Sequence, residues 1–403
     1  MHIRYVLSRF PKLSETFVLD QITSVIDAGH NVDIFARIDP EQEQVHPDVE
    51  RYALLDKVTY ADIPKSKPRR LLSAAHLIFA NAVNTPQKIR TGLDFRTYGR
   101  DALSLQLLHG LLAYPADTMD ITHAHFGPNG NLCAILKEAG DIDRLVITFH
   151  GSDLDLAENR PRVYEPAFKM ADRIIVKSVH NKRRLLGLGA SDDDIIVVPL
   201  GIDTELFAFQ PPADMSSPGE EILVLSVGRL VAVKGHEYGL RAFLETVERN
   251  PSVPLRYRII GGGPREQRLR RLAESLGISD AVEFAGEKTL DVVAEEMCRA
   301  DIFLHPSVHE GFGRALVEAQ ASGLPVVTTD VGGIPEAVQP GESALMAPPR
   351  TPLALAENLD SLVNNSKRRE VMGRQGRGYV EGRFDSSSVT RQLLAVYTGL
   401  LED

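Results

Sequence analysis

Apolar residues occur along this chain at two spacings, and its beginning already shows both. A short apolar run at residues 3–7 predicts a buried β-strand, and apolar side chains over residues 18–26 recur every three or four positions, as in a helix. Gly29 is placed to end that helix, and a second apolar run covers residues 32–36. A strand, a helix and a strand in this order are typical of a parallel sheet covered by helices.

The same order starts again in the second half of the chain. Residues 222–227 and 255–260 are predicted strands, and the segment between them carries helically spaced apolar residues up to Pro251. Further predicted strands, separated by helices, lie at residues 282–285, 301–305 and 325–328. We therefore expect an α/β protein with two doubly wound parallel sheets in tandem.

Three segments interrupt or close this pattern. Residues 210–220 are rich in Pro and Ser and have no periodicity, which predicts a linker between two domains. The Gly-rich segment at residues 373–382 predicts irregular structure. The apolar spacing over residues 389–401 then predicts a final helix.

Length and charge narrow the class of protein. The chain has 403 residues, and its 45 Lys and Arg against 55 Asp and Glu give a net charge of −10. Since single domains usually hold about 100 to 200 residues, this length favours two domains, each with its own core. An acidic chain lacks the basic surface that phosphate neutralisation requires, so we do not expect nucleic acid as a partner.

The cysteines and the longest uncharged stretch bear on the compartment. Cys133 and Cys298 are too far apart in sequence to suggest a disulfide framework or a CxxC metal pair, which favours the reducing cytoplasm. The longest charge-free stretch, residues 71–87, contains polar residues and is shorter than the about 20 apolar residues of a membrane span. We therefore expect a cytoplasmic protein that does not cross the bilayer.

One segment reverses the sign of the overall charge. Residues 57–100 contain nine Lys and Arg but only two acidic residues, Asp62 and Asp94. Helical apolar segments at residues 71–79 and 103–112 lie within it or beside it. The excess of cations and the apolar segments of residues 57–112 therefore predict one of two roles. The region either contacts anionic lipid peripherally at the inner face of the cell membrane or forms a solvated helical insert.

Ligands of open parallel sheets bind at the carboxyl ends of the strands, so the loops there are the first candidates for a site. After the predicted strand at 222–227, Arg229 and Lys234 stand five positions apart, with Gly228 and Gly235 beside them. Two cations near a helix start suit a diphosphate, with the arginine as a bidentate donor and the lysine as a point charge. The alternative is two ordinary solvated cations.

A second glycine-rich turn, Gly261-Gly262-Gly263-Pro264, follows the strand at 255–260. The full dinucleotide motif G-x-G-x-x-G would require glycine where Glu266 stands, which weakens an NAD-dependent oxidoreductase as an interpretation. The glycines indicate either a close backbone approach to a nucleotide or simply a tight turn between a strand and a helix.

The longest motif covers residues 305–319. Glu310 lies in the loop after a predicted strand, and Glu318 lies eight residues later, two turns into the next helix. Gly311 and Gly313 leave backbone N–H groups open at the helix start, where anions bind, and the two carboxylates can accept from hydroxyl groups. This combination indicates a phosphorylated ligand with hydroxyls, such as a nucleotide sugar. The alternative is that the carboxylates only face solvent or the helix dipole.

Several histidines and aspartates in the first half are weaker candidates. His150 follows an apolar strand beside a glycine, where it can face a ligand and transfer protons near neutral pH. His123 and His125 alternate as in a strand and share a face, but we expect no metal because a third ligand at convincing spacing is missing. The common pattern Asp153-Leu154-Asp155 is not adopted as a metal site.

Together these motifs resemble glycosyltransferase family 4, whose members are retaining nucleotide-sugar transferases of GT-B architecture. The four motifs that carry the resemblance occur in the family's order: the loop at 228–235, the turn at 261–264, the Glu310 to Glu318 element, and residues 329–336. The segment at residues 10–17 is similar to the opening of bacterial members that assemble exopolysaccharides and other surface polysaccharides.

The resemblance implies a role for each motif residue. Arg229 and Lys234 would bind the donor diphosphate, and Glu318 the nucleotide ribose. Glu310 and the amides of residues 311–313 would hold the transferred sugar, which His150 would face across a cleft, so that His150 and Glu310 are the candidate catalytic residues. Further candidate donor contacts are Ser14, which is also a predicted helix N-cap, Gly311, Phe312, Gly313, Arg314 and Gly262.

The resemblance also implies an architecture. Two Rossmann-like doubly wound domains would face each other across a cleft. Residues 1–205 would form the acceptor domain and residues 206–383 the donor domain, while residues 384–403 would form a helix that crosses back to the first domain.

The implied activity is metal-independent transfer of a hexose, with retention, from a nucleoside-diphosphate sugar. The acceptor would be a glycan or a polyprenyl-diphosphate-linked acceptor in bacterial polysaccharide or glycolipid biosynthesis, and no cofactor is expected. The alternatives are a sugar-nucleotide epimerase or phosphorylase on the same architecture and a non-catalytic sugar-nucleotide-binding protein.

Overall fold

The computed structural model of the protein describes residues 1–12, 15–40, 45–160, 162–209 and 221–402, which form two compact units. The N-terminal unit holds residues 1–177, 182–198 and the chain from Thr390 onward, and the C-terminal unit holds residues 178–181 and 199–389. Ser14 and the predicted linker at 210–220 lie outside the described residues.

In the described part of the N-terminal unit, seven parallel strands form one sheet in the order β3-β2-β1-β4-β5-β6-β7. The strands are β1 (His2–Arg9), β2 (Asn31–Ile38), β3 (Val58–Tyr60), β4 (Ile121–His125), β5 (Leu145–Phe149), β6 (Arg173–Val176) and β7 (Ile195–Val197). The strands predicted from the apolar runs at the start of the chain are confirmed. Central strands β4 and β5 are buried along their whole length, as expected for a sheet covered on both faces.

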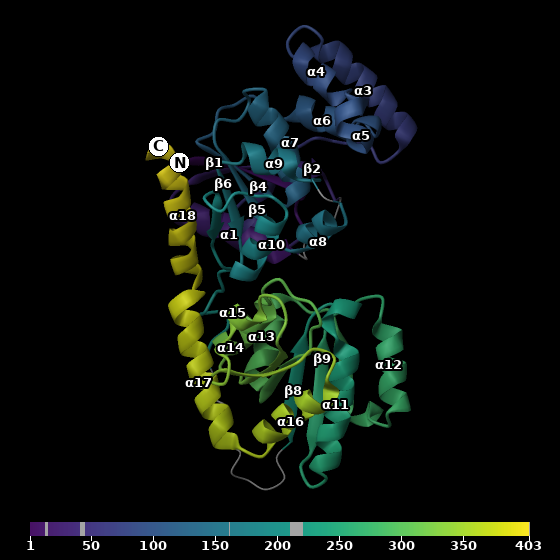
Figure 1. The fold of residues 1–403 in the computed structure, drawn as a ribbon, viewed down its shortest axis with the longest axis vertical. Helices are drawn as coiled ribbons and strands as arrows, with labels where there is room; N and C mark the ends of the chain where they lie inside the picture. Colours follow the sequence, from purple (N-terminus) through teal and green to yellow (C-terminus); the bar gives the residue numbers. More distant parts are fainter. Residues whose placement is uncertain (13–14, 41–44, 161, 210–220, 403) are drawn as a thin grey trace. The chain divides into compact units, whose positions relative to one another are not determined.

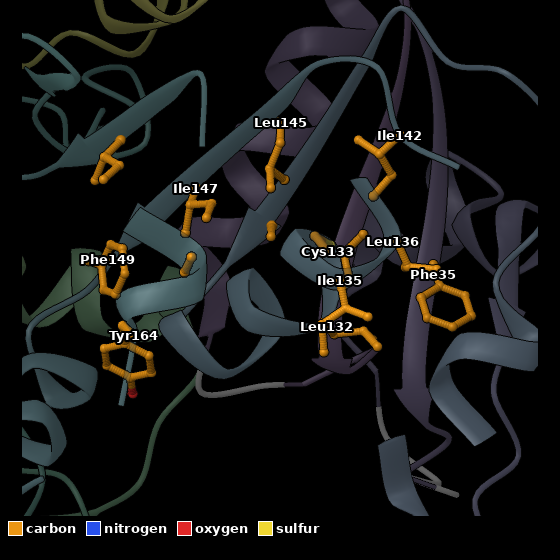
Figure 2. Packing of buried hydrophobic residues seen from close by; sticks show 14 of the residues in the cluster. Phe35, Leu132, Cys133, Ile135, Leu136, Ile142, Leu145, Ile147, Phe149 and Tyr164 are labelled. Atoms are coloured by element: carbon orange, nitrogen blue, oxygen red, sulfur yellow. The ribbon is translucent and has the colours of Figure 1, made fainter. Parts of the chain in front are cut away.

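The N-terminal unit also contains helices. They are α1 (Thr16–Asp27), α2 (Pro47–Arg51), α3 (Lys67–Asn81), α4 (Pro86–Gly92), α5 (Phe95–Leu103), α6 (Gln106–Ala113), α7 (Gly127–Glu138), α8 (Ser152–Asn159), α9 (Glu165–Met170) and α10 (Val179–Gly187). Helix α7 packs on β4 and β5, and Figure 2 shows Leu132 and Leu136 of this helix among the buried residues of the core, with Ile147 on the sheet. The core thereby fixes where the carboxyl ends of β4 and β5 lie.

Helices α3 to α6 form an insert between β3 and β4, and Figure 1 shows them gathered into one group. Helix α6 joins the insert to the unit, because it packs against α3, α4 and α5 and also against α7. The described helices include none that is long and apolar enough to cross a membrane.

In the C-terminal unit, the described residues form a six-stranded parallel sheet in the order β10-β9-β8-β11-β12-β13. Its strands are β8 (Ile222–Val227), β9 (Leu255–Ile260), β10 (Val282–Gly286), β11 (Ile302–His305), β12 (Val326–Thr329) and β13 (Ala344–Ala347). Its helices are α11 (His236–Arg249), α12 (Glu266–Ser275), α13 (Leu290–Arg299), α14 (Arg314–Ala321), α15 (Ile334–Ala337), α16 (Pro352–Val363) and α17 (Ser366–Arg383). The predicted strands and the repeat of the α/β order are confirmed.

The prediction of irregular structure at residues 373–382 is wrong, because this segment lies inside helix α17. Gly373 is required by packing: a Cβ atom there would lie 2.0 Å from the carbonyl oxygen of Gly323. The glycine lets α17 approach the end of α14 closely, and the cost of glycine in a helix is offset by that contact. The final helix is confirmed as α18 (Ser386–Glu402).

Candidate active site

Three loops at the carboxyl ends of neighbouring strands form the candidate site of the C-terminal unit. They follow β8, β11 and β12, which lie side by side in the sheet. The amide of Val308 donates to the carbonyl of Val233 at 2.8 Å, and the amide of Gly333 donates to the carbonyl of Glu310 at 3.0 Å. These backbone bonds hold the three predicted motifs against one another.

Glu310 is the centre of this site. Its carboxylate forms an ion pair with the ammonium of Lys234 and lies 3.3 Å from Nε2 of His305, whose ring in turn lies 2.9 Å from the hydroxyl of Ser307. Burial opposes ionisation, but Lys234 and the hydrogen bond with His305 outweigh it, and the pKa of Glu310 stays well below its usual range. Glu310 is therefore a carboxylate at neutral pH, and both partners contact its Oε2 atom.

The two predicted diphosphate cations differ in their surroundings. Lys234 ends the short 3₁₀ helix Ala232–Lys234 and is largely buried against Glu310. Arg229, two residues after the end of β8, is exposed, and its guanidinium has no partner among the described residues. The structure therefore places one cation beside the catalytic candidate and leaves the other free to meet an anion.

Glu318 is buried in α14, and it is paired. Nε of Arg314 donates to Oε1 of Glu318 at 2.6 Å, one helical turn away. Arg314 thus contacts a buried carboxylate and orients it, which the sequence alone did not decide. The pair balances its own charge inside the unit.

Backbone donors stand beside these carboxylates. The amides of Gly311, Phe312 and Gly313 have no hydrogen-bond acceptor in the described part of the chain, and they precede the first turn of α14. The ring of Phe312 is buried, with its centroid 5.4 Å from that of Phe384, so its side chain belongs to the core. Only the backbone of Phe312 is left to contact a ligand.

The turn at 261–264 supports the site from behind. Gly261 has φ of +138°, and a Cβ atom there would lie 2.0 Å from the carbonyl oxygen of Gly228. The glycines are therefore needed for the approach of two protein loops, and this accounts for them without a dinucleotide. At Gly262 a Cβ atom would meet the side chain of Glu287 at 2.7 Å, so the donor contact predicted for Gly262 stays a prediction.

His236 is a neighbour of the site that the sequence did not single out. It begins α11, is buried, and lies close to the carbonyls of Gly228 and Arg229. Burial lowers its pKa to about 4, so the ring is neutral near pH 7. Two signals in the sequence could have identified these histidines as candidates. His236 directly follows Gly235 of the predicted loop, and His305 is the last residue of β11.

The N-terminal unit carries a second cluster at the carboxyl ends of its central strands. His150 follows β5, and its ring contacts those of Phe17 and Phe126, with centroid distances of 4.7 Å and 4.5 Å. Nε2 of His150 lies 2.9 Å from Nδ1 of His125, and the two rings are stacked. Burial is the main reason why the pKa of His150 lies well below its usual value.

His123 extends this cluster into the core, and its predicted position on one face with His125 is confirmed by the stacking of the two rings at 4.6 Å. Nδ1 of His123 lies 2.5 Å from the hydroxyl of Tyr397 in α18, and Nε2 lies 2.7 Å from the hydroxyl of Thr148. The described residues contain no group of three or more His, Cys, Asp or Glu placed to hold a metal ion.

Asp153 and Asp155 have structural partners. The buried carboxylate of Asp153 accepts from the amides of Gly127, His150 and Leu154 at 3.0–3.2 Å. Burial raises its pKa to about 6, although these amide donors oppose the shift. Asp155 instead pairs with Arg184 at 2.5 Å. Asp153 therefore orders the loop that carries His150.

Two family models match the sequence, one in each half of the chain. Residues 14–206 match the family model described as "Glycosyltransferase Family 4", and residues 212–379 match "Glycosyl transferases group 1". The chain is 33% identical to the "Putative colanic acid biosynthesis glycosyltransferase WcaL" of Escherichia coli K12, over 99% of this chain and 100% of that protein. It is 29% identical to the "Amylovoran biosynthesis glycosyltransferase AmsK" of Erwinia amylovora, over 98% and 99% of the two chains.

Solved structures agree on the fold. A sucrose-phosphate synthase from Thermosynechococcus elongatus matches with a TM-score of 0.73 at 21% identity, over 100% of this chain and 99% of that one. HepE from Anabaena matches with a TM-score of 0.72 at 18% identity, over 99% and 100%. The predicted α/β fold with two Rossmann-like domains is confirmed, and its structural neighbours are GT-B glycosyltransferases. Together with the relatives matched over nearly their whole length, this shows that the chain belongs to glycosyltransferase family 4 and is a glycosyltransferase.

Proposed function

We propose that the protein transfers a hexose, with retention and without a metal ion, from a nucleoside-diphosphate sugar to a glycan or polyprenyl-diphosphate-linked acceptor. The observation that carries this proposal is the arrangement of Lys234, Glu310 and the unpaired Arg229 at adjacent strand ends. The glycosyltransferase names of its relatives favour transfer over the alternatives of an epimerase, a phosphorylase or a silent binding protein.

The chemistry assigns separate tasks to these groups. As the bond from the sugar to the diphosphate breaks, negative charge grows on the leaving diphosphate and positive charge on the sugar ring. Arg229 and Lys234 stabilise the leaving group, and the Glu310 carboxylate lies beside Lys234 to orient the sugar and oppose its positive charge. Glu318, oriented by Arg314, accepts from the ribose hydroxyls.

His150 is the catalytic candidate that lies in the N-terminal unit. The rings of Phe17 and Phe126 and the nitrogen of His125 fix the orientation of its imidazole, and the ring is neutral near pH 7. With Nε2 occupied by His125, a neutral imidazole has one nitrogen left for a single hydrogen bond to a substrate oxygen.

The donor is tested first by thermal shift with UDP-, GDP-, ADP- and TDP-sugars, since a ligand that binds only the folded state raises its apparent stability. HepE has been solved in complex with UDP and with UDP-glucose, which makes UDP-sugars the first choice. We expect one nucleotide class to stabilise the protein, with EDTA leaving both the shift and the transfer rate unchanged. Loss of transfer in EDTA that is restored by a divalent ion would refute the metal-free mechanism.

The helical insert supports a lipid-linked acceptor. Leu72 and Phe79 of α3 and Val83 just beyond its end are 72%, 87% and 90% exposed, and they recur at helical spacing. Large apolar side chains that are this exposed on neighbouring turns mark an interaction surface. Lys67 and Arg69 lie in the first turn of the same helix, both exposed and without an ion-pair partner among the described residues.

Not every cation of the insert is available for lipid. Arg70 donates to the carbonyls of Pro64 and Ser104 and so anchors α3, and Lys88 forms an ion pair with Asp141 at 2.8 Å. The remaining combination of exposed apolar and cationic side chains is that of a helix lying on an anionic membrane surface. We therefore assign peripheral membrane contact to α3.

Co-sedimentation with vesicles tests this assignment. At low salt we expect the protein to bind phosphatidylglycerol vesicles, to bind phosphatidylcholine vesicles much less, and to lose binding in Phe79→Ser and Leu72→Ser. Leu353→Ser, which removes an exposed leucine from the C-terminal unit, is the matched control. Equal binding of Phe79→Ser and Leu353→Ser to the anionic vesicles would rule out α3 as the contact.

A further inference from the structure

Lys177 is a buried lysine whose position the proposed mechanism does not use. It directly follows β6, and since Phe149 and Val176 are register partners, Lys177 and His150 are the next residues on two adjacent strands. Its side chain is only 6% exposed. Lysines are almost never this buried unless an acidic or carbonyl group pairs with them.

No such partner is present in the described part of the chain. The ammonium of Lys177 makes no ion pair or hydrogen bond there, and burial alone accounts for its pKa of about 8. The groups that feel its charge are three imidazoles, those of His123, His125 and His150, and each is shifted away from protonation. The surroundings of Lys177 therefore add no negative charge.

The buried carboxylate at this end of the sheet is occupied elsewhere. Asp153 uses its oxygens for the amides of Gly127, His150 and Leu154, and it exerts no resolved effect on Lys177. An ammonium that is buried without a counter-ion destabilises the folded state. Such an arrangement is explained if the counter-ion arrives with a ligand.

A second donor stands beside it. One ring nitrogen of His150 is occupied by His125, but Nδ1 of His150 has no hydrogen-bond partner among the described residues. When the proton lies on Nδ1, this nitrogen can donate to an oxygen atom of a ligand. An ammonium and an imidazole N–H on adjacent strand ends suit a phosphate or a carboxylate.

We propose that Lys177 and His150 form an anion-binding subsite in the N-terminal unit that takes a phosphate or carboxylate group of the acceptor. This inference rests on the proposed function, because it assigns the acceptor to the N-terminal unit and the donor diphosphate to Arg229 and Lys234. The anion has two sources: the diphosphate of a lipid carrier or the carboxylate of an acidic sugar.

Thermal shift and calorimetry with inorganic pyrophosphate and with glucuronate separate these sources. The parent is the double variant Arg229→Ala/Lys234→Ala, in which the cations of the donor site are removed. We expect the parent to bind one probe, and the addition of Lys177→Met to weaken that binding at least tenfold. The control, Lys169→Met, removes an exposed lysine of α9 and should bind like the parent.

Each outcome decides the question. Binding of pyrophosphate alone indicates the lipid diphosphate, and binding of glucuronate alone indicates an acidic sugar. Equal affinity of the Lys177→Met and Lys169→Met variants for both probes, or no binding to the parent, would overturn the subsite. UDP-sugar binding measured in the single variant Lys177→Met tests the donor site separately, and it should equal that of wild type even if the subsite fails.

Discussion

The two clusters at the strand ends differ in how their charges are balanced. In the C-terminal unit, Lys234 faces Glu310 and Arg314 faces Glu318, so each buried charge has an opposite neighbour. In the N-terminal unit, Lys177 lies among neutral histidines and has no counter-ion among the described residues. The first cluster is compensated before any ligand arrives, whereas the second is not.

This difference distinguishes groups that are preorganised for catalysis from groups that gain a counter-ion only when a ligand binds. Paired charges are held in fixed geometry, which suits groups that must stabilise a developing charge without reorganisation. An unpaired buried charge destabilises the free protein and gains most from an anion. The following predictions test this contrast, beginning with the largest effect.

The largest effect is expected on breaking the compensated pair. Glu310→Gln keeps the shape but removes the charge, and it leaves Lys234 without its partner. We expect the transfer rate to fall by roughly 10²- to 10³-fold in Glu310→Gln and in Lys234→Met, as for other lost electrostatic contacts to a transition state. Steady-state kinetics give the measurement, and the exposed Glu342→Gln is the control. Near wild-type turnover in either variant would remove this pair from the mechanism.

Removal of the unpaired Lys177 should instead stabilise the folded protein. Burial lowers the pKa of Lys177 to about 8, so the folded state disfavours the charged lysine at every pH below the pKa of the unfolded chain. From a normal lysine pKa of about 10.4, the cost near pH 7 is on the order of 3 kcal/mol, which Lys177→Met should recover.

The pH dependence of this gain makes the prediction specific. Between about pH 8 and 10 the wild-type folded state has lost the Lys177 proton that the unfolded state still binds, so its stability rises with pH. The difference in melting temperature between Lys177→Met and wild type should therefore be full below pH 8 and shrink towards pH 10. A constant difference would show that the variant changes packing and that the charge is not the cause.

A smaller difference between the two clusters is expected in their stability at acidic pH. His123, His125 and His150 are buried with pKa values well below the normal value of about 6.5, so the unfolded chain binds more protons as the pH falls below that value. Near the site of the C-terminal unit, burial lowers the pKa of His236 and His305, but Glu310 opposes the shift at His305. Hydrogen exchange at pH 5 relative to pH 7 should lose several-fold more protection in β4 and β5 than in β8 and β11, and equal losses would contradict the contrast.

The smallest effect is expected from a substitution that keeps Glu318 paired with a cation. Arg314→Lys retains a cation four residues before Glu318, so the buried carboxylate stays paired, and we expect the KM for the donor to rise only a few-fold. Arg314→Met leaves a buried carboxylate unpaired and should raise that KM more. Identical donor KM values in both variants would show that Arg314 does not orient Glu318.

Much of the fold could be predicted because each apolar run has its own local signature. The strands β8 and β9 agree with the predicted bounds residue by residue, since each is a short segment of largely apolar residues that ends at a glycine turn. Helix α17 was missed because its glycines suggested irregular structure, whereas Gly373 is required by the close approach of Gly323, a residue far away in sequence.

The candidate site could be predicted where its motifs are local, as in the Glu310 to Glu318 element. The pairing of these residues with other motifs could not be predicted. Lys234 is far from Glu310 in sequence, and only the order of strands in the sheet brings the two together. The same holds for Lys177, which in the sequence is one more lysine after an apolar run.

The sequence by itself determined the α/β order, the repeated doubly wound pattern and the residue types of the two strand-end clusters. These features depend on local spacing, which the hydrophobic effect and helix geometry translate directly into elements. Tertiary structure alone decided which charges are paired and which cation is buried without a partner. Burial and the distance to a counter-ion set the energy of a charge, and both depend on residues that meet only when the sheet has formed.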